Sequence, residues 1–469
     1  MALVYAIVER GTFAINAYQD EQKSPLTWTN DKAFLRGYFY CDKPPGVSFA
    51  AVPIYALQWK ARDWSSWLGR MPQDQWVALS RYVATLLTSA LSGALLGCVL
   101  LALARRFGLS DRAGFVLSVG LLLGTVLAGY AALFYAYLPA ALFTSAAYLL
   151  LLDARLKGGD ALKRGWLLFW VGLLIGLAWF FDITSGLVGI ALSLYAAWFM
   201  RRHVWAIWKL VVGGLIPVAV FCWYAHTIFG EFTIPYKYEF DDLFRTEMAK
   251  GFQGIHLPRL TTLYYLTIHP FKGLFFYSPF LLLTFAGIGM AFRRKKATQE
   301  ERTFLPDVVL ATGIIVAYFL YNSGYYMWWG GWAAGPRLLC PAIPYFIAPL
   351  ALWLARKTPL RAGLFASLLT ISVLFNFMIL AVDPQIPTGI DTKEILKAKV
   401  SHNLSSAVLD DVIPRFCSGT MEQNSRTVNA LSLNFGNLAL GWNGKTALLP
   451  LAALWLAVAV WLGLRKQKE

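Results

Sequence analysis

The stretch LLTSALSGALLGCVLLALARR, residues 86–106, decides the fold. It carries no charged side chain before the closing Arg105-Arg106 pair. A helix needs about 20 mainly apolar residues to cross the hydrocarbon core of a bilayer, and this run supplies nearly that many. Further runs of this kind elsewhere in the chain would indicate a protein that crosses the membrane several times.

The composition of the whole chain agrees with this start. Hydrophobic residues make up 58% of the 469 residues and charged residues only 14%, with a mean hydropathy of +0.52. These values exceed what a soluble core needs and predict an all-α polytopic membrane protein. The formal charge of +16 does not indicate nucleic-acid binding, because Lys and Arg lie mostly in short clusters between apolar runs, as expected for topology signals and contacts with membrane lipids.

Eleven runs are long and apolar enough to be expected as transmembrane helices. They are 76–104, 112–129, 131–152, 166–182, 184–200, 206–226, 274–292, 305–322, 337–355, 361–382 and 446–464. Basic clusters fall at every second connection, namely at 105–112, 155–164, 201–202, 293–296, 356–361 and 465–468. All six then lie on one side, which the positive-inside rule makes cytoplasmic.

The longer, aromatic-rich connections fall on the opposite, extracytoplasmic side. We expect a first outer loop over 1–75, a bundle over 76–382 with outer loops 227–273 and 322–336, an outer loop over 383–445, and a last helix with a basic tail over 446–469. Residues 1–75 would need a preceding helix to cross the membrane. We therefore expect that a first transmembrane helix is missing; the alternative is a translocated N-terminal tail.

The first outer loop contains two expected interfacial segments. Residues 3–13 predict a short amphipathic helix ended at Gly11, and the apolar run 47–60 is too short to span. The second segment is expected to lie in the outer interface of the membrane. It follows Asp42 and Lys43, which would then stand at the depth of a lipid phosphate. Of the five cysteines, Cys41 and Cys417 are the only plausible disulfide pair, but the sequence alone does not decide whether they form a bond.

Other outward residues could join such a site. Asp182 lies at a turn between two apolar runs, where a helix cap with Thr184 or Ser185 is as good an interpretation as a functional role. Arg81 could reach a phosphate, but snorkelling to headgroups is the favoured interpretation. The loop 227–273 adds candidates that are mostly expected at the solvated surface: His226, Glu231, Tyr236, Lys237, Arg259, His269 and Lys272.

A second dense feature is YYMWWGGWAAGPR, residues 325–337. Aromatic faces such as Trp329 and Trp332 can stack on sugar rings, glycine lets the backbone approach closely, and Arg337 can bind phosphate in bidentate fashion. An interfacial aromatic belt with a snorkelling arginine is the alternative. The density of Gly beside Trp favours the functional interpretation.

The order of these features resembles bacterial members of the GT-C superfamily, integral-membrane glycosyltransferases that use polyprenyl-phosphate-linked sugars, including protein O-mannosyltransferases and aminoarabinose transferases. Four strings carry the resemblance: YAIVERGTF (5–13), NDKA with GYFYCDKPPG (30–33 and 37–46), PFKGLFFYSP (270–279) and WWGGWAAGPR (328–337). They extend from the first residues to about residue 350; the transmembrane sequence between them is generic.

The resemblance implies that the first outer loop supplies the catalytic groups. It implies Asp42 as a carboxylate that orients the acceptor or a divalent metal, Lys43 as a contact to the lipid phosphate, and Arg337 as a further phosphate or sugar contact, with Trp329, Trp332 and Lys272 beside them. No cofactor is certain, and a divalent metal is an option. In such families the general base lies before the first amphipathic helix, so it is expected to be absent here, and Glu9 is the nearest substitute.

The expected activity is therefore transfer of a sugar from a polyprenyl-phosphate donor to a lipid, glycan or protein acceptor, by an inverting displacement. The expected location is a bacterial inner membrane, with the site facing the periplasm or exterior. Two alternatives stay open: a transporter or flippase of lipid-linked saccharides, and a catalytically inactive truncated homologue. The transporter would need charges buried along several spans, whereas the polar residues here gather in the outer loops.

Overall fold

The computed structural model describes residues 1–23, 27–158, 166–293, 302–386, 404–419, 440–442 and 444–465. This part of the chain is mainly helical and has almost no strands, which confirms the all-α class. Its one sheet is the hairpin of β1 (Ala33–Leu35) and β2 (Tyr38–Tyr40), in which Phe34 pairs with Phe39. Parts of the expected loop 383–445 and of the basic clusters (residues 387–403, 420–439, 163–164, 294–296 and 466–468) lie outside the described residues.

The helices of the first half are α1 (Ala2–Arg10), α2 (Gly46–Trp64), α3 (Ser66–Gly69), α4 (Gln73–Thr85), α5 (Leu91–Arg106), α6 (Asp111–Leu123), α7 (Leu127–Ala131), α8 (Tyr137–Leu156), α10 (Leu167–Phe181), α11 (Gly186–Phe199) and α12 (Ile207–Phe229). Those of the second half are η5 (Pro235–Tyr238), α13 (Asp242–Met248), α14 (Leu260–Thr267), α15 (Leu274–Tyr277), α16 (Leu283–Phe292), α18 (Leu305–Gly324), η7 (Arg337–Phe346), α19 (Ile347–Ala355), α20 (Pro359–Val382), α22 (Ile413–Ser418) and α24 (Leu449–Arg465).

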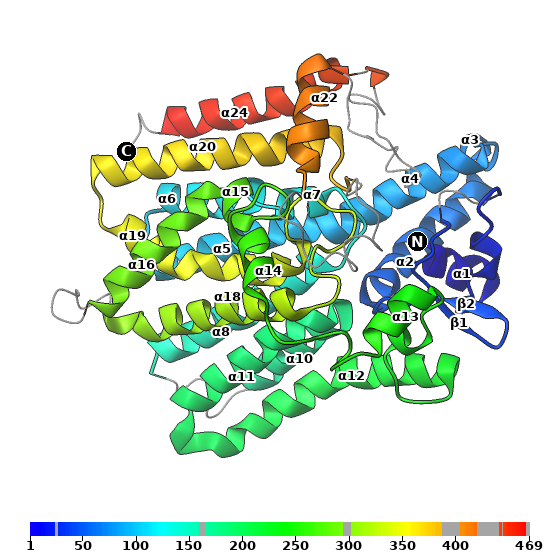
Figure 1. Ribbon diagram of the computed structural model, residues 1–469, viewed down its shortest axis with the longest axis horizontal. Coiled ribbons are helices and arrows are strands. Elements are labelled where there is room, and N and C mark those ends of the chain that lie inside the picture. The colour runs from blue at the N-terminus through cyan, green and yellow to red at the C-terminus, as the bar shows by residue number, and fades with distance from the viewer. Residues whose placement is uncertain are drawn as a thin grey trace.

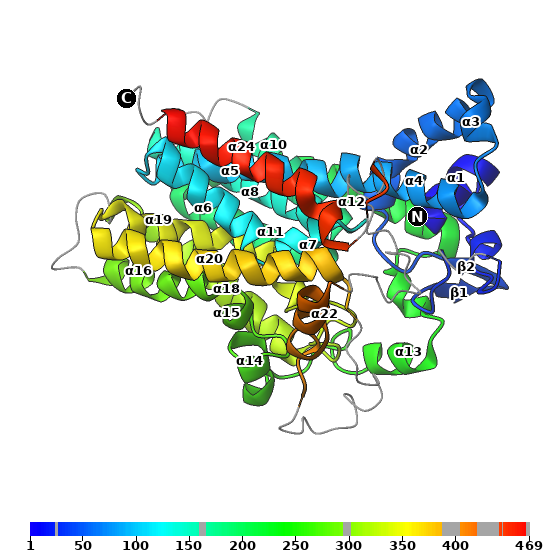
Figure 2. The same ribbon diagram turned by 90° about the horizontal axis from the view of Figure 1, so that it is seen from above.

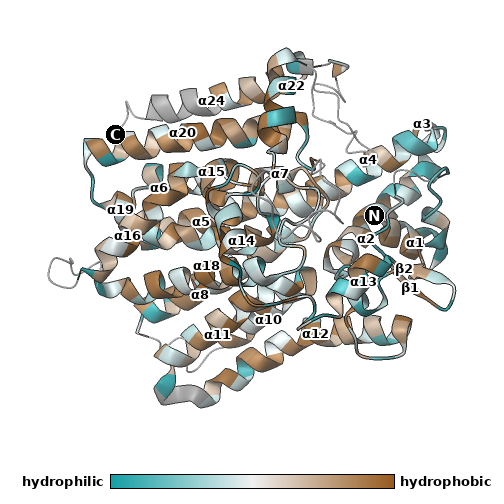
Figure 3. Ribbon diagram, viewed as in Figure 1, coloured by the Kyte–Doolittle hydropathy of each residue, from teal (hydrophilic) through white to brown (hydrophobic). Residues whose placement is uncertain are grey.

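Long apolar helices lie side by side in a bundle (Figures 1 and 2), and apolar residues cover much of their length (Figure 3). Six helices in the described residues are long and apolar enough to cross a membrane: Gln73–Arg106, Tyr137–Leu156, Ile207–Phe229, Leu305–Gly324, Arg337–Ala355 and Pro359–Val382. This supports a membrane protein. The expected count of eleven spans is not confirmed, because the other expected runs form shorter helices, such as α6 and α10.

Ion pairs tie the helices together at the end of the bundle that carries the basic connections. Arg106, at the end of α5, pairs with Asp153 at 2.6 Å near the end of α8. Arg155 pairs with Asp307 of α18, a fully buried carboxylate that also accepts hydrogen bonds from Tyr148 and Tyr195 at 3.0 and 2.7 Å. A buried carboxylate with several donors is stabilised in its charged form. The spans are thus not charge-free, but this charge is paired.

The opposite end carries α1, α2, the hairpin and α13 (Figures 1 and 2). The expected amphipathic helix is confirmed: α1 buries Leu3 and Tyr5 and ends at Gly11, whose φ of 62° is left-handed. The Glu9 carboxylate accepts hydrogen bonds from Tyr18 at 2.7 Å and from Tyr55 of α2 at 2.5 Å. Glu9 therefore fastens α1 to α2. The run 47–60 is helical as expected, within the longer α2.

Glycines let α10 and α12 approach almost to backbone contact. A Cβ atom added to Gly172 would lie 1.9 Å from the carbonyl oxygen of Leu210, and one added to Gly213 would lie 2.0 Å from that of Phe169. No Cβ atom fits at such distances, so the two helices could keep this packing only with glycine at both positions. Small residues at helix crossings are typical of membrane helix pairs.

We expect Gly172→Ala or Gly213→Ala to separate α10 from α12 and to destabilise the protein by about 1–3 kcal/mol, the usual cost of overpacking. Thermal unfolding of the purified protein in detergent measures the change. Gly289→Ala and Gly313→Ala are matched controls, because an added Cβ at either helical position meets nothing within 4 Å. Equal shifts for all four variants would contradict the close packing of α10 on α12.

Candidate functional site

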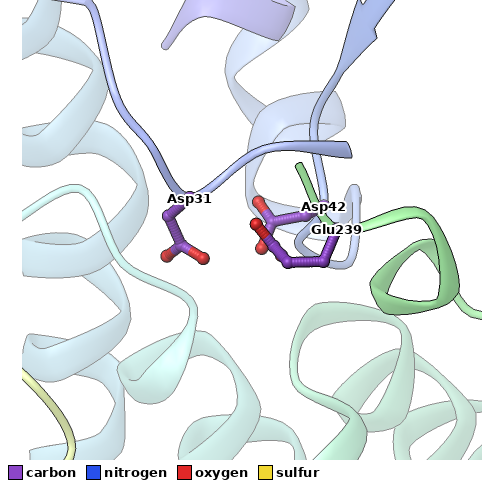
Figure 4. A group of neighbouring side chains, drawn as sticks. All are labelled: Asp31, Asp42 and Glu239. Atoms are coloured by element: carbon purple, nitrogen blue, oxygen red, sulfur yellow. The ribbon is translucent and has the colours of Figure 1, made fainter. Parts of the chain in front are cut away.

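Three carboxylates meet at the end of the bundle that carries the hairpin. Asp31, Asp42 and Glu239 each place an oxygen within 4.8 Å of the other two (Figure 4). Asp42 and Glu239 are buried, with 1% and 3% of their surface exposed. Asp31 comes shortly before β1, Asp42 shortly after β2, and Glu239 directly after η5. We call these three residues the carboxylate triad.

Backbone pairing explains how distant residues form the triad. In an antiparallel hairpin the start of the first strand lies beside the end of the second, so Asp31 and Asp42 come to the same end. Ala33 forms a further antiparallel bridge with Glu239. Phe240 donates a backbone hydrogen bond of 2.7 Å to the Lys32 carbonyl, and the Lys32 N–H donates one of 3.3 Å to Glu239 Oε1. Residues 239–240 thus pair with the backbone of residues 32–33 along one edge of the hairpin.

Lys43 lies among the acids. Its Nζ is 2.7 Å from Asp31 Oδ1 and 2.5 Å from Asp42 Oδ2, and it lies 5.1 Å from the centroid of the Tyr236 ring. Burial disfavours the charged ammonium, but Asp31 and Asp42 outweigh that effect and raise the pKa of Lys43 well above its usual value. The Lys43 side chain is still 46% exposed. The Lys43 ammonium can therefore both neutralise charge on the two carboxylates and contact a bound ligand.

One ammonium does not balance three carboxylates. Burial, and then repulsion from Asp31, raise the pKa of Glu239 to about 7. Burial and Asp31 likewise raise the pKa of Asp42 well above its usual value. The triad therefore holds a proton at neutral pH more readily than isolated carboxylates do, which suits a group that exchanges protons.

The same three residues could hold a metal ion. Carboxylate oxygens are the ligands that Mg²⁺, Mn²⁺ and Ca²⁺ prefer, and the triad brings three of them together around an excess of negative charge. Lys43 lies against two of these carboxylates, so a bound cation would compete with its ammonium. The residues fit a divalent cation only if Lys43 turns away.

Arg337 and Lys272 bring positive charge to the same region. The charge of Arg337 acts on Asp31, and its Nη1 lies 3.5 Å from the Tyr135 hydroxyl. Its buried Nε has no hydrogen-bond partner among the described residues. Lys272 is 2% exposed and donates to the carbonyl oxygens of Ala333 and Gly331. Arg337 therefore interacts electrostatically with Asp31 of the triad, while Lys272 is held by the backbone of residues 331–333.

The glycine pair of the loop 325–337 makes room for Arg337. Gly330 and Gly331 have φ of 74° and 65°, which side-chain-bearing residues rarely adopt. A Cβ atom at Gly330 would lie 2.8 Å from Cγ of Arg337. The backbone thus folds over the arginine stem, as the density of glycine in the sequence suggested.

The remaining predicted residues are placed differently. Trp329 is 1% exposed and packs inside the loop against Trp328, whereas Trp332 is 39% exposed and has a free surface. Asp182 accepts hydrogen bonds from the N–H and hydroxyl of Thr184 at 3.1 and 2.8 Å, which supports the cap interpretation. Cys41 and Cys417 are both free thiols, so the considered disulfide is not formed.

Sequence reasoning missed Asp31 and Glu239 as site residues. Asp31 lies within the string NDKA, where it carries a carboxylate just before a strand, so a signal was present. Glu239 had none, because it is one of several acids in 227–273 and only its bridge to Ala33 places it. Glu231 and Lys237, two candidates from that loop, instead pair with each other at 2.6 Å.

Comparison with models of protein families, with curated proteins and with solved structures finds no match to this chain.

We expect the triad to bind Mn²⁺ in the purified protein, with an affinity that falls as the pH drops below about 7, because Glu239 must lose its proton to bind a cation. Asp42→Asn and Glu239→Gln should weaken binding by at least about tenfold, since even an outer-shell partner can be worth that much. Isothermal titration calorimetry with MnCl₂ measures both effects.

Lys43→Ala should tighten Mn²⁺ binding, because it removes the competing ammonium. Glu231→Gln is the control, since Glu231 pairs with Lys237 elsewhere in the same segment, 227–273, as Glu239. Mn²⁺ binding that is equally strong in Glu239→Gln and Glu231→Gln would show that the triad is not the metal site.

Proposed function

We propose that this protein is a glycosyltransferase that transfers a sugar from a polyprenyl-phosphate-linked donor to a lipid, glycan or protein acceptor. One observation carries the proposal: the carboxylate triad lies against Lys43 at one end of an apolar helical bundle, and Arg337 interacts electrostatically with Asp31 of the triad and with Lys272. Carboxylates and cations are what this reaction needs, since one group must accept a proton and another must balance a departing phosphate.

Sequence segments that are far apart support the same proposal. The resemblance to GT-C enzymes rested on separate strings in the first 46 residues, at 270–279 and at 328–337. The charge of Arg337 acts on both Asp31 and Lys272. Electrostatic interaction thus links charged residues from three of these strings, which supports the proposal.

The chemistry follows from the charges. The acceptor hydroxyl attacks the anomeric carbon of the donor sugar, a carboxylate of the triad takes the hydroxyl proton, and the bond from the anomeric carbon to the phosphate oxygen breaks. The electron pair of that bond leaves with the lipid phosphate, where Lys43 and Arg337 stabilise the negative charge. Asp42 is the carboxylate we assign to the proton. Glu9 already accepts hydrogen bonds from two tyrosine hydroxyls, and its role in this proposal is to position α1.

We expect Lys43→Ala and Arg337→Ala each to reduce sugar transfer by about 100-fold or more, the effect of removing a group that stabilises developing charge. Proteoliposomes supplied with a polyprenyl-phosphate sugar and analysed by mass spectrometry of the lipid and acceptor products measure the transfer. Lys237→Ala is the matched control, because Lys237 is an exposed lysine in the outer loop that pairs with Glu231. Undiminished sugar transfer in the double variant Lys43→Ala, Arg337→Ala would contradict the proposal.

The charge of Lys272 gives a pH dependence. Burial, and then the nearby Arg337, lower the pKa of Lys272 to about 7, so its positive charge is present below pH 7 and lost above it. We expect the affinity for the anionic donor to fall as the pH rises through 7. Lys272→Arg keeps its charge at every accessible pH and should make this dependence weaker, leaving only the part that comes from deprotonation of Glu239 near the same pH. Donor binding measured by scintillation proximity between pH 6 and 8 tests this; an unchanged slope in Lys272→Arg contradicts it.

A further inference from the structure

A second polar hollow lies beside the triad, on the outer side of the segment that carries Glu239. It has a volume of about 520 Å³ and is lined by Phe34, Phe240, Asp241, Asp242, Leu243 and Arg245. Neighbouring residues of extended backbone point to opposite sides. Glu239, which is 3% exposed, turns into the triad, while Phe240, which is 42% exposed, turns outward to the hollow. One short segment thus separates the two.

The aromatic wall of the hollow is held in place. Phe34 and Phe39 face each other across the hairpin, with ring centroids 5.1 Å apart, and each also contacts Phe240, at 5.9 and 5.2 Å. Behind them the buried Lys32 ammonium lies 4.3 Å from the centroid of Phe39 and 5.2 Å from that of Phe240. Edge-to-face contacts and a cation behind the rings fix their orientation. Phe34 and Phe240 therefore present a fixed apolar surface to solvent.

The rim of the hollow is charged with both signs. Asp241 accepts backbone hydrogen bonds from Leu243 and Phe244 at 2.9 and 3.3 Å, which fixes its carboxylate at the start of α13. Asp242 and Arg245 form an exposed ion pair one turn apart. Planar carboxylate and guanidinium groups can each bind two neighbouring hydroxyls. The rim therefore offers both donors and acceptors next to the ring faces.

This combination selects among ligands. A lipid chain would make no use of the charged groups at the rim. A strongly charged peptide would meet both attraction and repulsion, because two carboxylates and one guanidinium line the hollow. A neutral saccharide has no such conflict: its C–H face packs on an aromatic ring, and its hydroxyls donate to carboxylates and accept from guanidinium.

We propose that the hollow of Phe34, Phe240, Asp242 and Arg245 is a saccharide-binding subsite that holds the acceptor. The inference rests on the proposed function and narrows its acceptor to a glycan. Only the segment 239–240 separates the hollow from the triad, so a glycan bound there lies next to the carboxylates of the proposed reaction. Transfer then extends the glycan by one sugar.

The test uses the full chain in lipid nanodiscs and a panel of neutral trisaccharides: maltotriose, cellotriose, mannotriose and chitotriose. Saturation-transfer NMR should show contact between protein aromatic protons and sugar C–H protons for at least one of them. Phe240→Ala should weaken binding of that trisaccharide at least about tenfold, a size expected for loss of a stacking ring. Phe240→Trp, which keeps an aromatic face, should retain it.

Phe252→Ala is the matched control, because Phe252 is 75% exposed in the same outer loop but does not line the hollow. Failure of all four trisaccharides to bind at millimolar concentration overturns the inference, as does an equal loss in Phe240→Ala and Phe252→Ala. Tighter binding of a tri-lysine peptide than of any trisaccharide, lost in Phe240→Ala, overturns it in favour of a cationic peptide.

Donor binding is measured on the same samples to separate the two proposals. If donor binding depends on Lys43 and Arg337 but trisaccharide binding is unchanged in Phe240→Ala, the proposal of an acceptor subsite is wrong and the glycosyltransferase proposal stands. If donor binding is unchanged in the Lys43→Ala and Arg337→Ala variants, the proposed function is wrong even where a trisaccharide binds at the hollow.

Discussion

The contact of Lys43 with Asp31 and Asp42 is the interaction on which the hairpin end of the molecule depends. It joins the two arms of the first-loop hairpin, at 2.7 and 2.5 Å, where carboxylates would otherwise repel each other. Without a cation, burying Asp42 beside Asp31 would be costly, and one of them would have to stay protonated. The Lys43 ammonium thereby allows the carboxylate triad to be buried. Because the Lys43 side chain is partly exposed, another cation can take the place of its ammonium.

The two ends of the bundle use charge in different ways. At the end with the basic connections, Asp307 is fully buried and receives Arg155 together with two tyrosine hydroxyls, so its charge is compensated. At the hairpin end three carboxylates share one ammonium, and Arg337 keeps a buried Nε without a partner among the described residues. A buried charge with partners is costly to disturb, because removal of one partner leaves the other uncompensated. Uncompensated charges with shifted pKa values are instead a mark of functional sites.

Most of the architecture could be predicted from the sequence, because hydrophobic length and period are local properties. The long runs at 76–104, 305–322, 337–355 and 361–382 became helices with nearly the same ends. The count of eleven spans is not confirmed: the run 112–129, for example, contains Gly124 and Thr125, where α6 stops before α7 begins. Within the site, Asp42, Lys43 and Arg337 carried local signals such as a Pro-Pro corner or a Gly-Gly turn. Glu239 carried none, since its place depends on a bridge to a residue more than 200 positions away.

The β-bridge between Ala33 and Glu239 explains why one small element can couple two kinds of recognition. Its backbone alternates, so a single step along the chain moves from an acid in the buried triad to an aromatic ring at the surface hollow. Any shift of this segment by one residue would exchange the two, placing Phe240 among the carboxylates and Glu239 in solvent. The register is protected by the hydrogen bond from Phe240 to the Lys32 carbonyl and by the contact of the Lys32 ammonium with the Phe240 ring. The geometry that builds the acidic centre is therefore the same geometry that fixes the surface beside it.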